Sequence, residues 1–204
     1  MFKTVSHWLD LSSTPGRPCV TGSPLSIKIQ RRGFDGARRK YRPSKVRLLL
    51  IAESPPSSGG FFYFSTTIGK DHLFRETMKT LGLWPLDLPM GRGVDKRPML
   101  HRFRSLGCYL LDTCVLPVDK LDPAARRAAV LNGLDRLTGD VHTADPANIV
   151  IVKSSIFNPV NAALDRAGFG TRVLNESPVP FPSHGNQEKY RRMMKKLLGL
   201  AGLL

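Results

Sequence analysis

Continuous apolar runs alternate along this chain with segments in which apolar residues recur every three or four positions. Runs of the first kind occupy residues 46–52 (VRLLLIA), 108–111 (CYLL) and 148–152 (NIVIV), and a shorter one occupies 171–174. A short uninterrupted apolar run is typical of a strand that is buried on both faces. The four runs therefore predict the strands of a mainly parallel sheet, with 46–52 at its centre.

Segments with helical spacing separate these runs. Asp122 and Pro123 mark one helix start, because Asp accepts hydrogen bonds from the first backbone N–H groups and Pro suits the first helical position. Asn186 is expected to cap the last helix. The expected helices span 71–81, 98–106, 123–137, 159–167 and 187–198. This alternation predicts an α/β fold, a three-layer α/β/α sandwich around a central, mainly parallel four-stranded sheet.

The first 44 residues lack such periodicity. Residues 12–26 are rich in Ser, Thr, Pro and Gly, and residues 31–44 carry a run of Arg and Lys. The sequence therefore predicts a basic N-terminal arm over 1–44 and a single domain over 45–204. The basic run is either a solvated loop or a segment that contacts phosphate groups.

Charge narrows the choice of partners. The 204 residues include 31 Lys and Arg against 16 Asp and Glu, which gives a formal net charge of +15. A field of this sign favours polyanions, and nucleic acid is the commonest of them. The longest apolar stretch, 197–204, is much shorter than the roughly 20 residues of a membrane span, and the first residues form no apolar leader. We expect a cytoplasmic monomer that binds DNA and no membrane.

Motifs for cofactors and metals are absent from the sequence. The chain has no Walker-type phosphate loop and no G-x-G-x-x-G after an expected strand. Its five His residues are scattered, and Cys19, Cys108 and Cys114 form no C-x-x-C. We therefore expect reduced thiols, no cofactor and no metal.

Polar residues stand where the expected strands end. In open parallel sheets the site lies outside the carboxyl ends of the strands. That rule selects Glu53, Asp112, the segment 153–155 and the loop 180–186, with four aromatic residues at 61–64 close to Glu53. A carboxylate at the end of a buried strand costs free energy unless it is hydrogen-bonded. Glu53 is therefore either a cap for nearby backbone amides or a group that takes part in chemistry.

Three of these segments resemble motifs of the uracil-DNA glycosylase superfamily. Residues 50–55 (LIAESP) resemble its first motif, in which a strand ends in G-E-A-P-G or G-Q-D-P-Y. Residues 109–114 (YLLDTC) are similar to its second-strand segment, which ends in an Asn that reads uracil. Residues 181–184 (FPSH) resemble its H-P-S motif. The order of elements agrees over 46–198, so the resemblance implies that 45–204 is a glycosylase-like catalytic domain.

The chain departs from the superfamily pattern at three positions. Ala52 replaces the usual Gly, Asp112 stands where Asn is expected, and Phe181 stands where the motif His would be. His184 follows three positions after Phe181. The chain therefore resembles an outlying branch of the superfamily.

The resemblance implies roles for the strand-end side chains. Glu53 would stabilise the oxocarbenium-like sugar and orient the attacking water. His184 would hydrogen-bond O2 of the departing base, or else it is a solvated loop residue. Ser57, Ser154 and Ser183 would contact DNA phosphates.

The flipped base would stack on aromatic rings and be read by Asp112. Phe62 and Phe64 share one face of an extended segment, which makes them the stacking candidates. An ionised Asp accepts from uracil N3–H but cannot donate to O4. Either Asp112 is protonated, or a backbone N–H completes the recognition, or the preferred base is not simply uracil. The other reading of Asp112 is a helix cap or the partner of an Arg.

Together these residues favour a DNA repair glycosylase that hydrolyses the N-glycosidic bond of uracil, or of another deaminated base, in base excision. Two other functions fit parts of the sequence. A catalytically silent nucleic-acid-binding module would explain the altered Asn and His positions. A metal-dependent hydrolase of nucleotides or phosphoesters would use Glu53 and Asp112.

Overall fold

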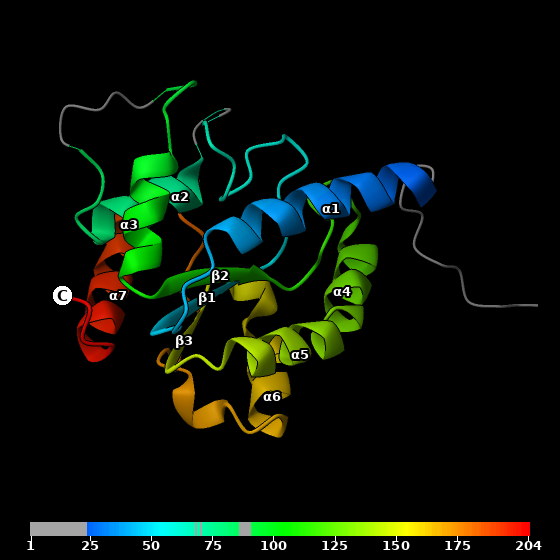
Figure 1. The fold of residues 1–204 in the computed structure, drawn as a ribbon. Coiled ribbons are helices and arrows are strands. Elements are labelled where there is room, and N and C mark those ends of the chain that lie inside the picture. The colour runs from blue at the N-terminus through cyan, green and yellow to red at the C-terminus, as the bar shows by residue number, and fades with distance from the viewer. Residues whose placement is uncertain (1–23, 68, 70, 86–90) are drawn as a thin grey trace, which may run out of the picture.

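A parallel sheet of three strands forms the centre of the protein (Figure 1). The computed structural model describes residues 24–67, 69, 71–85 and 91–204. The strands are β1 (Leu48–Ala52), β2 (Cys108–Asp112) and β3 (Asn148–Ile151), in the order β2-β1-β3. Leu50 of β1 lies in register with Leu110 and Val150 of its two neighbours. All five residues of β1 are buried, which confirms the prediction of a central strand covered on both faces.

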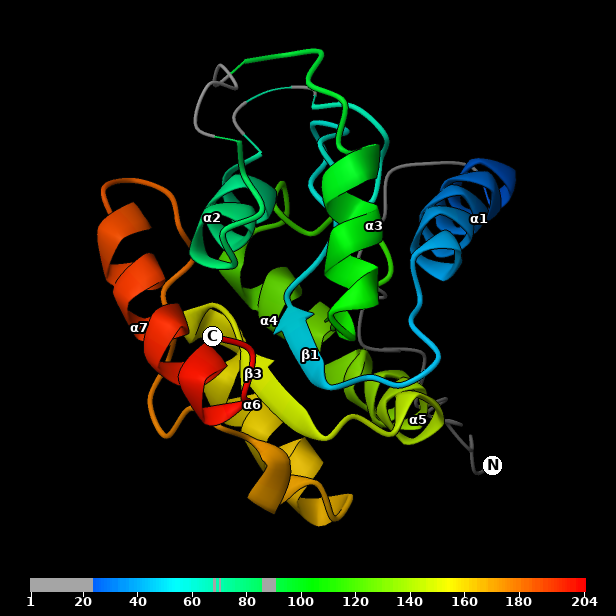
Figure 2. The same cartoon turned by 60° about the vertical axis from the view of Figure 1, so that its left-hand side comes forward.

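Helices cover both sides of this sheet. They are α1 (Pro24–Lys40), α2 (His72–Thr80), α3 (Arg97–Ser105), α4 (Pro123–Asn132), α5 (Leu134–Ala144), α6 (Ser154–Arg166) and α7 (Gln187–Leu200). The connection from β1 to β2 and the one from β2 to β3 run in opposite directions across the sheet, so right-handed crossovers place their helices on opposite faces. Figures 1 and 2 show α2, α3 and α7 on one side and α5 and α6 on the other. The predicted α/β class is confirmed.

The expected fourth strand is wrong. Within 171–174, a 3-10 turn (Gly170–Arg172) replaces it, and Val173 forms only an isolated parallel bridge with Ile149. The side chain of Asn175 occupies the edge of β3 instead. Its Oδ1 accepts from the backbone N–H of Ile151 at 2.9 Å, and its Nδ2 donates to the carbonyl oxygen of Ile151 at 3.1 Å. At Ile151 a side-chain amide thus takes both backbone groups that a fourth strand would have paired, whereas Leu174 and Val179 still form backbone hydrogen bonds with Ile149 and Lys153.

Helix boundaries differ from the prediction on either side of β3. The helix expected over 123–137 is two helices, α4 and α5, divided at Gly133, where a Cβ would lie 2.3 Å from the carbonyl oxygen of Thr113. Asp122 caps α4 as predicted, because its side chain accepts from two backbone N–H groups. Helix α6 begins at Ser154, so Pro159 lies inside it and not at its start. Asn186 precedes α7 but makes no capping hydrogen bond with its side chain.

Residues 24–40 of the expected arm form helix α1, so the prediction of a segment without periodicity is wrong there. Residues 1–23 lie outside the described residues. Phe34 of α1 and Tyr41, which directly follows the helix, are buried in the core. The Phe34 ring lies 4.9 Å from that of Phe61, and Tyr41 stacks on Tyr63 at 6.1 Å between ring centroids. Positions 34, 37 and 41 do have helical spacing, but the surrounding run of basic residues conceals it.

Within the described part of the chain, no helix has the length and apolar character that crossing a membrane requires.

Candidate active site at the carboxyl ends of the strands

A cavity of about 700 Å³ opens where the three strands end. Its walls come from the loops after β1 and β3, the start of α2, the end of β2, one turn of α4 and the loop before α7. The strand-end rule therefore located the cavity. Of the expected site residues, those that line it are Glu53, Phe62, Asp112, Ser183 and His184.

Glu53 is held by three side chains from two neighbouring segments. Its Oε1 accepts from Arg126 Nε at 3.0 Å and from Ser155 Oγ at 3.1 Å. Its Oε2 accepts from Lys153 Nζ at 2.6 Å and from Nη2 of Arg126. A carboxylate offers about four acceptor positions. All four are occupied, so Glu53 has none left with which to orient a water molecule in this arrangement.

These partners fix the charge of Glu53. Burial alone would raise the pKa of this carboxyl group, but the hydrogen bonds and charges of Arg126 and Lys153 outweigh burial, and the pKa lies below its ordinary value. Glu53 is therefore a permanently ionised group at neutral pH. Lys153 reaches it from a left-handed backbone conformation, φ 95°, which is strained for a residue with a side chain.

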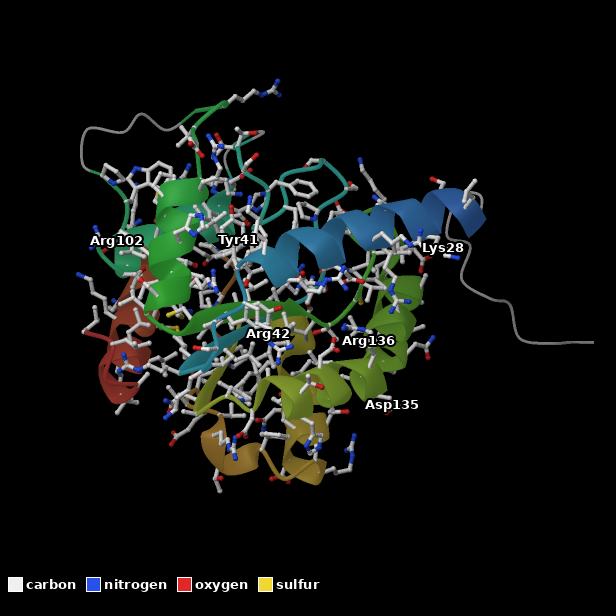
Figure 3. The ribbon with its side chains drawn as sticks, in the orientation of Figure 1. Lys28, Tyr41, Arg42, Arg102, Asp135 and Arg136 are labelled. Carbon is white, nitrogen blue, oxygen red and sulfur yellow. The ribbon has the colours of Figure 1, made fainter. Side chains whose placement is uncertain are left out.

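Asp112 is the partner of an Arg, which was one of the two readings of this residue. Its Oδ2 accepts from Arg38 Nη2 of α1 at 2.8 Å, and both side chains are buried. Burial raises the pKa of Asp112 above its ordinary value, although Arg38 acts in the opposite direction. Arg136 of α5 donates to the backbone oxygens of Asp112 and Thr113 at 2.6 and 2.8 Å, and it lies between α5 and α1 (Figure 3).

The aromatic segment 61–64 is a turn, so the expected alternation of faces is wrong. The backbone N–H of Phe64 donates to the carbonyl oxygen of Phe61 at 3.1 Å, which closes the turn. Phe61 and Phe62 both line the cavity, together with Phe74 of α2. Phe64 does not line it and stacks on Phe34 at 5.8 Å. The stacking candidates are therefore Phe61 and Phe62, and Phe64 belongs to the packing of α1.

The loop before α7 brings Phe181, Ser183 and His184 to the cavity rim. His184 is exposed and has φ 50°, and Gly185 follows with φ 83°. His184 Nδ1 and Ser183 Oγ lie 2.9 Å apart and share a hydrogen bond. A His in this position can reach the atoms of a bound molecule that project from the cavity.

Two of the three expected phosphate-contacting serines lie off the cavity wall. Ser57 is exposed, and both its backbone N–H and its Oγ donate to Asp119, at 3.1 and 2.7 Å. Ser154 is exposed at the start of α6, and it is the next residue, Ser155, that bonds Glu53. Only Ser183 combines a place on the wall with the expected position.

A second buried ion pair in the cavity wall was not anticipated. Lys96, whose side chain is completely buried, donates from Nζ to Asp71 Oδ2 at 3.0 Å and to the carbonyl oxygen of Phe61 at 2.9 Å. Its ammonium lies 4.3 Å from the centroid of the Phe74 ring. Asp71 itself lines the cavity. No local signal in the sequence marks Lys96, because lysine is ordinarily a surface residue.

Among the residues that the structure describes, no three His, Cys, Asp or Glu side chains gather as a metal site would require. Cys108 and Cys114 are buried free thiols, and burial raises the pKa of each to about 12. Neither is therefore a nucleophile at neutral pH.

No protein-family model matches the chain, and no curated protein matches it by sequence.

Proposed function

We propose that the protein is a DNA glycosylase that flips a deaminated base, uracil first, into the cavity at the strand ends and hydrolyses its N-glycosidic bond. The observation that carries the proposal is that one cavity combines an aromatic wall, the ionised carboxylate of Glu53 and the imidazole of His184 at its rim. Its volume of about 700 Å³ suits a nucleoside-sized ligand. The three-layer α/β/α sandwich of the superfamily is part of the proposal, with the bridge at Val173 in place of a fourth strand.

In this mechanism the base stacks on Phe61 and Phe62 in the cavity. Glu53 acts as a fixed negative charge near the sugar, which becomes cationic as the bond breaks. Because its four acceptor positions are filled, Glu53 contributes charge and another group orients the water. His184 donates a hydrogen bond to the departing base, which carries negative charge.

Helix α1 supports DNA binding. Arg38 contacts the end of β2, and the residues that precede it in α1 continue past the carboxyl ends of the strands (Figure 1). At 1.5 Å per residue, the fourteen residues of α1 that precede Arg38 extend roughly 20 Å. Lys28 and Arg32 on this part of the helix are exposed. A basic helix beside the cavity would contact the DNA backbone on one side of the flipped nucleotide.

The test measures base release directly. Purified protein is incubated with labelled oligonucleotides that carry uracil, hypoxanthine or xanthine, in the presence of a chelator, and abasic sites are then cleaved with alkali. We expect strand breaks at one or more of these bases and none in an undamaged control strand. Absence of breaks at all three bases contradicts the proposal.

A catalytically silent nucleic-acid-binding module is the second candidate, and one observation favours it. Every acceptor position of Glu53 is engaged by Arg126, Lys153 or Ser155, as in a purely structural ion pair. This module would bind the same oligonucleotides with base-dependent affinity and release no base. The metal-dependent hydrolase has less support, because Arg38 and Arg126 already hold the two carboxylates that would bind the metal.

A further inference from the structure

Asp71 precedes α2 but does not cap it. It occupies the N-cap position with φ 36° and ψ 51°, and its side chain accepts no hydrogen bond from the first turn of the helix. Asp122, in the same position before α4, accepts from the backbone N–H groups of Ala124 and Ala125 at 3.0 and 2.9 Å. A side-chain cap typically stabilises the helix that it begins. Asp71 does not stabilise α2 in this way, and its carboxylate lies in the cavity wall instead.

Lys96 fixes the orientation of that carboxylate. The ammonium of this fully buried side chain holds Asp71 Oδ2 at 3.0 Å and is itself anchored to the carbonyl oxygen of Phe61. Phe61 and Phe74 belong to the aromatic wall of the cavity. The ion pair is thus built into the surface on which a flat ligand would stack.

The second carboxylate oxygen of Asp71 remains available. Within the described residues, Oδ1 accepts no hydrogen bond. It lies 2.7 Å from the point where residue 60 would carry a Cβ, so only Gly60 permits this position of the oxygen. Gly60 also lines the cavity. A fixed acceptor therefore stands beside the aromatic wall.

We propose that Asp71 is the residue that recognises the base in this cavity, with Oδ1 accepting a hydrogen bond from a ring N–H that lies beside a carbonyl group. This inference rests on the proposed base-binding function and names its substrate class. Lys96 is a positioning residue, since it acts through Asp71. The resemblance implies that Asp112 reads the base, but Arg38 already binds Asp112, so we assign base reading to Asp71.

The chemistry of deamination suits a fixed acceptor. Cytosine N3 and adenine N1 carry lone pairs, whereas uracil and hypoxanthine carry N–H groups at the same ring positions. An ionised Asp accepts hydrogen bonds and donates none, so Asp71 attracts the deaminated base and repels its parent. Guanine and xanthine both carry N1–H, so this contact does not separate that pair.

Free bases test the assignment without any requirement for catalysis. Dissociation constants are measured by NMR titration for uracil, 3-methyluracil and cytosine, each carrying a methyl group at N1, where DNA carries the sugar, so that N3 is the only ring nitrogen that can hold a hydrogen. We expect the unmodified protein to bind uracil about fivefold to a hundredfold more tightly than either of the other two, because each of these has lost or opposed the hydrogen bond in a buried site. Equal affinities for uracil and 3-methyluracil, or no binding of uracil, overturn the assignment even where oligonucleotides release their bases.

The substitution Asp71→Asn should reverse the preference. Lys96 only donates, so the amide oxygen of Asn turns toward it and the amide NH₂ faces the cavity. Cytosine, which accepts at N3, should then bind more tightly than uracil. Asp119→Asn removes a carboxylate charge from another part of the same cavity lining and should leave the preference unchanged. An unchanged preference in Asp71→Asn contradicts the proposal.

Gly60→Ala provides a second variant that keeps every charge. Its Cβ displaces Asp71 Oδ1, so the affinity for uracil should fall severalfold and the affinity for 3-methyluracil should change little. Equal losses for both ligands would mean that Gly60 and Asp71 only shape the cavity, which contradicts base recognition. If base release fails but these affinities follow the expectation, the recognition is supported and the glycosylase reaction is not.

Discussion

Arg38 of α1 and Asp112 at the end of β2 form a buried ion pair with 2.8 Å between Nη2 and Oδ2. The two residues are 74 positions apart in the chain. The pair joins the N-terminal helix to the strand that forms one wall of the cavity. Arg38 Nε, also buried, has no hydrogen-bond partner among the described residues. Nη1 donates to Asp35 Oδ1 at 3.0 Å, so the charge of Arg38 is shared between the buried Asp112 and the partly exposed Asp35.

Removing one member of this pair should be much worse than removing both. Asp112→Ala removes the buried partner of the Arg38 guanidinium and leaves it only the partly exposed Asp35. Breaking a buried ion pair in this way typically costs up to about 3–5 kcal/mol of unfolding free energy. The double variant Arg38→Met, Asp112→Ala removes both charges and should recover much of that loss. Urea denaturation of the two single variants and the double variant measures the coupling. If the losses of unfolding free energy in the two single variants add up to the loss in the double variant, the contributions of Arg38 and Asp112 to stability are independent.

Glu53 should affect the chemical step more than DNA affinity. Glu53→Gln retains the shape of the side chain and removes the charge that would stabilise the sugar cation in the proposed mechanism, so single-turnover base release should fall by roughly 10²-fold or more. DNA affinity should stay within a few-fold. Ser155→Ala removes one hydrogen bond from the same carboxylate without changing its charge, and should slow release only a few-fold. Equal rates in Glu53→Gln and the unmodified protein would exclude electrostatic catalysis by Glu53.

DNA binding should depend strongly on salt because of the net charge of +15. Affinity for a duplex should fall about tenfold or more between dilute and moderate ionic strength. Arg32→Glu on the exposed part of α1 should weaken binding and lower the slope of log affinity against log salt. Arg166→Glu, an identical change at the end of α6, is the matched control. Equal losses in both variants would mean that total charge matters and that α1 is not the contact surface.

The sequence predicted the centre of the fold because burial on both faces leaves a continuous apolar run. β1, β2 and β3 are such runs, and their ends located the cavity with Glu53 and Asp112. The prediction of a fourth strand was wrong because the side chain of Asn175 forms hydrogen bonds with the backbone N–H and carbonyl oxygen of Ile151. No local pattern distinguishes that Asn from any other loop residue.

The partners of the site residues could not be predicted, because they come from distant parts of the chain. Arg126 and Lys153 are 73 and 100 positions away from Glu53. Each is one of 31 basic residues, and nothing in the flanking sequence marks the two that pair with a carboxylate. The prediction that Phe62 and Phe64 share one face was wrong because it assumes an extended backbone, whereas 61–64 is a turn.

Lys96 should make the stability of the protein rise with pH in the alkaline range. Burial, only partly opposed by Asp71, lowers the pKa of Lys96 from 10.5 to about 8. Between about pH 8 and 10.5 the unfolded chain therefore binds a proton that Lys96 has released in the folded protein, and the contribution of Lys96 to the free energy of unfolding increases with pH. Below about pH 8 both states are protonated, and the cost of the buried charge is fully present. The total change is on the order of 3 kcal/mol.

Urea unfolding from about pH 7 to 10 measures this contribution as the difference between the unmodified protein and Lys96→Met. The difference should grow in favour of the unmodified protein as the pH rises through 8. Burial also raises the pKa values of Cys108, Cys114, Tyr63 and Tyr190, which lowers stability at alkaline pH, but this effect is common to both proteins and cancels. Lys120→Met, at an exposed lysine, should run parallel to the unmodified protein. A difference for Lys96→Met that stays constant with pH would mean that Lys96 remains charged throughout, with Asp71 compensating its burial completely.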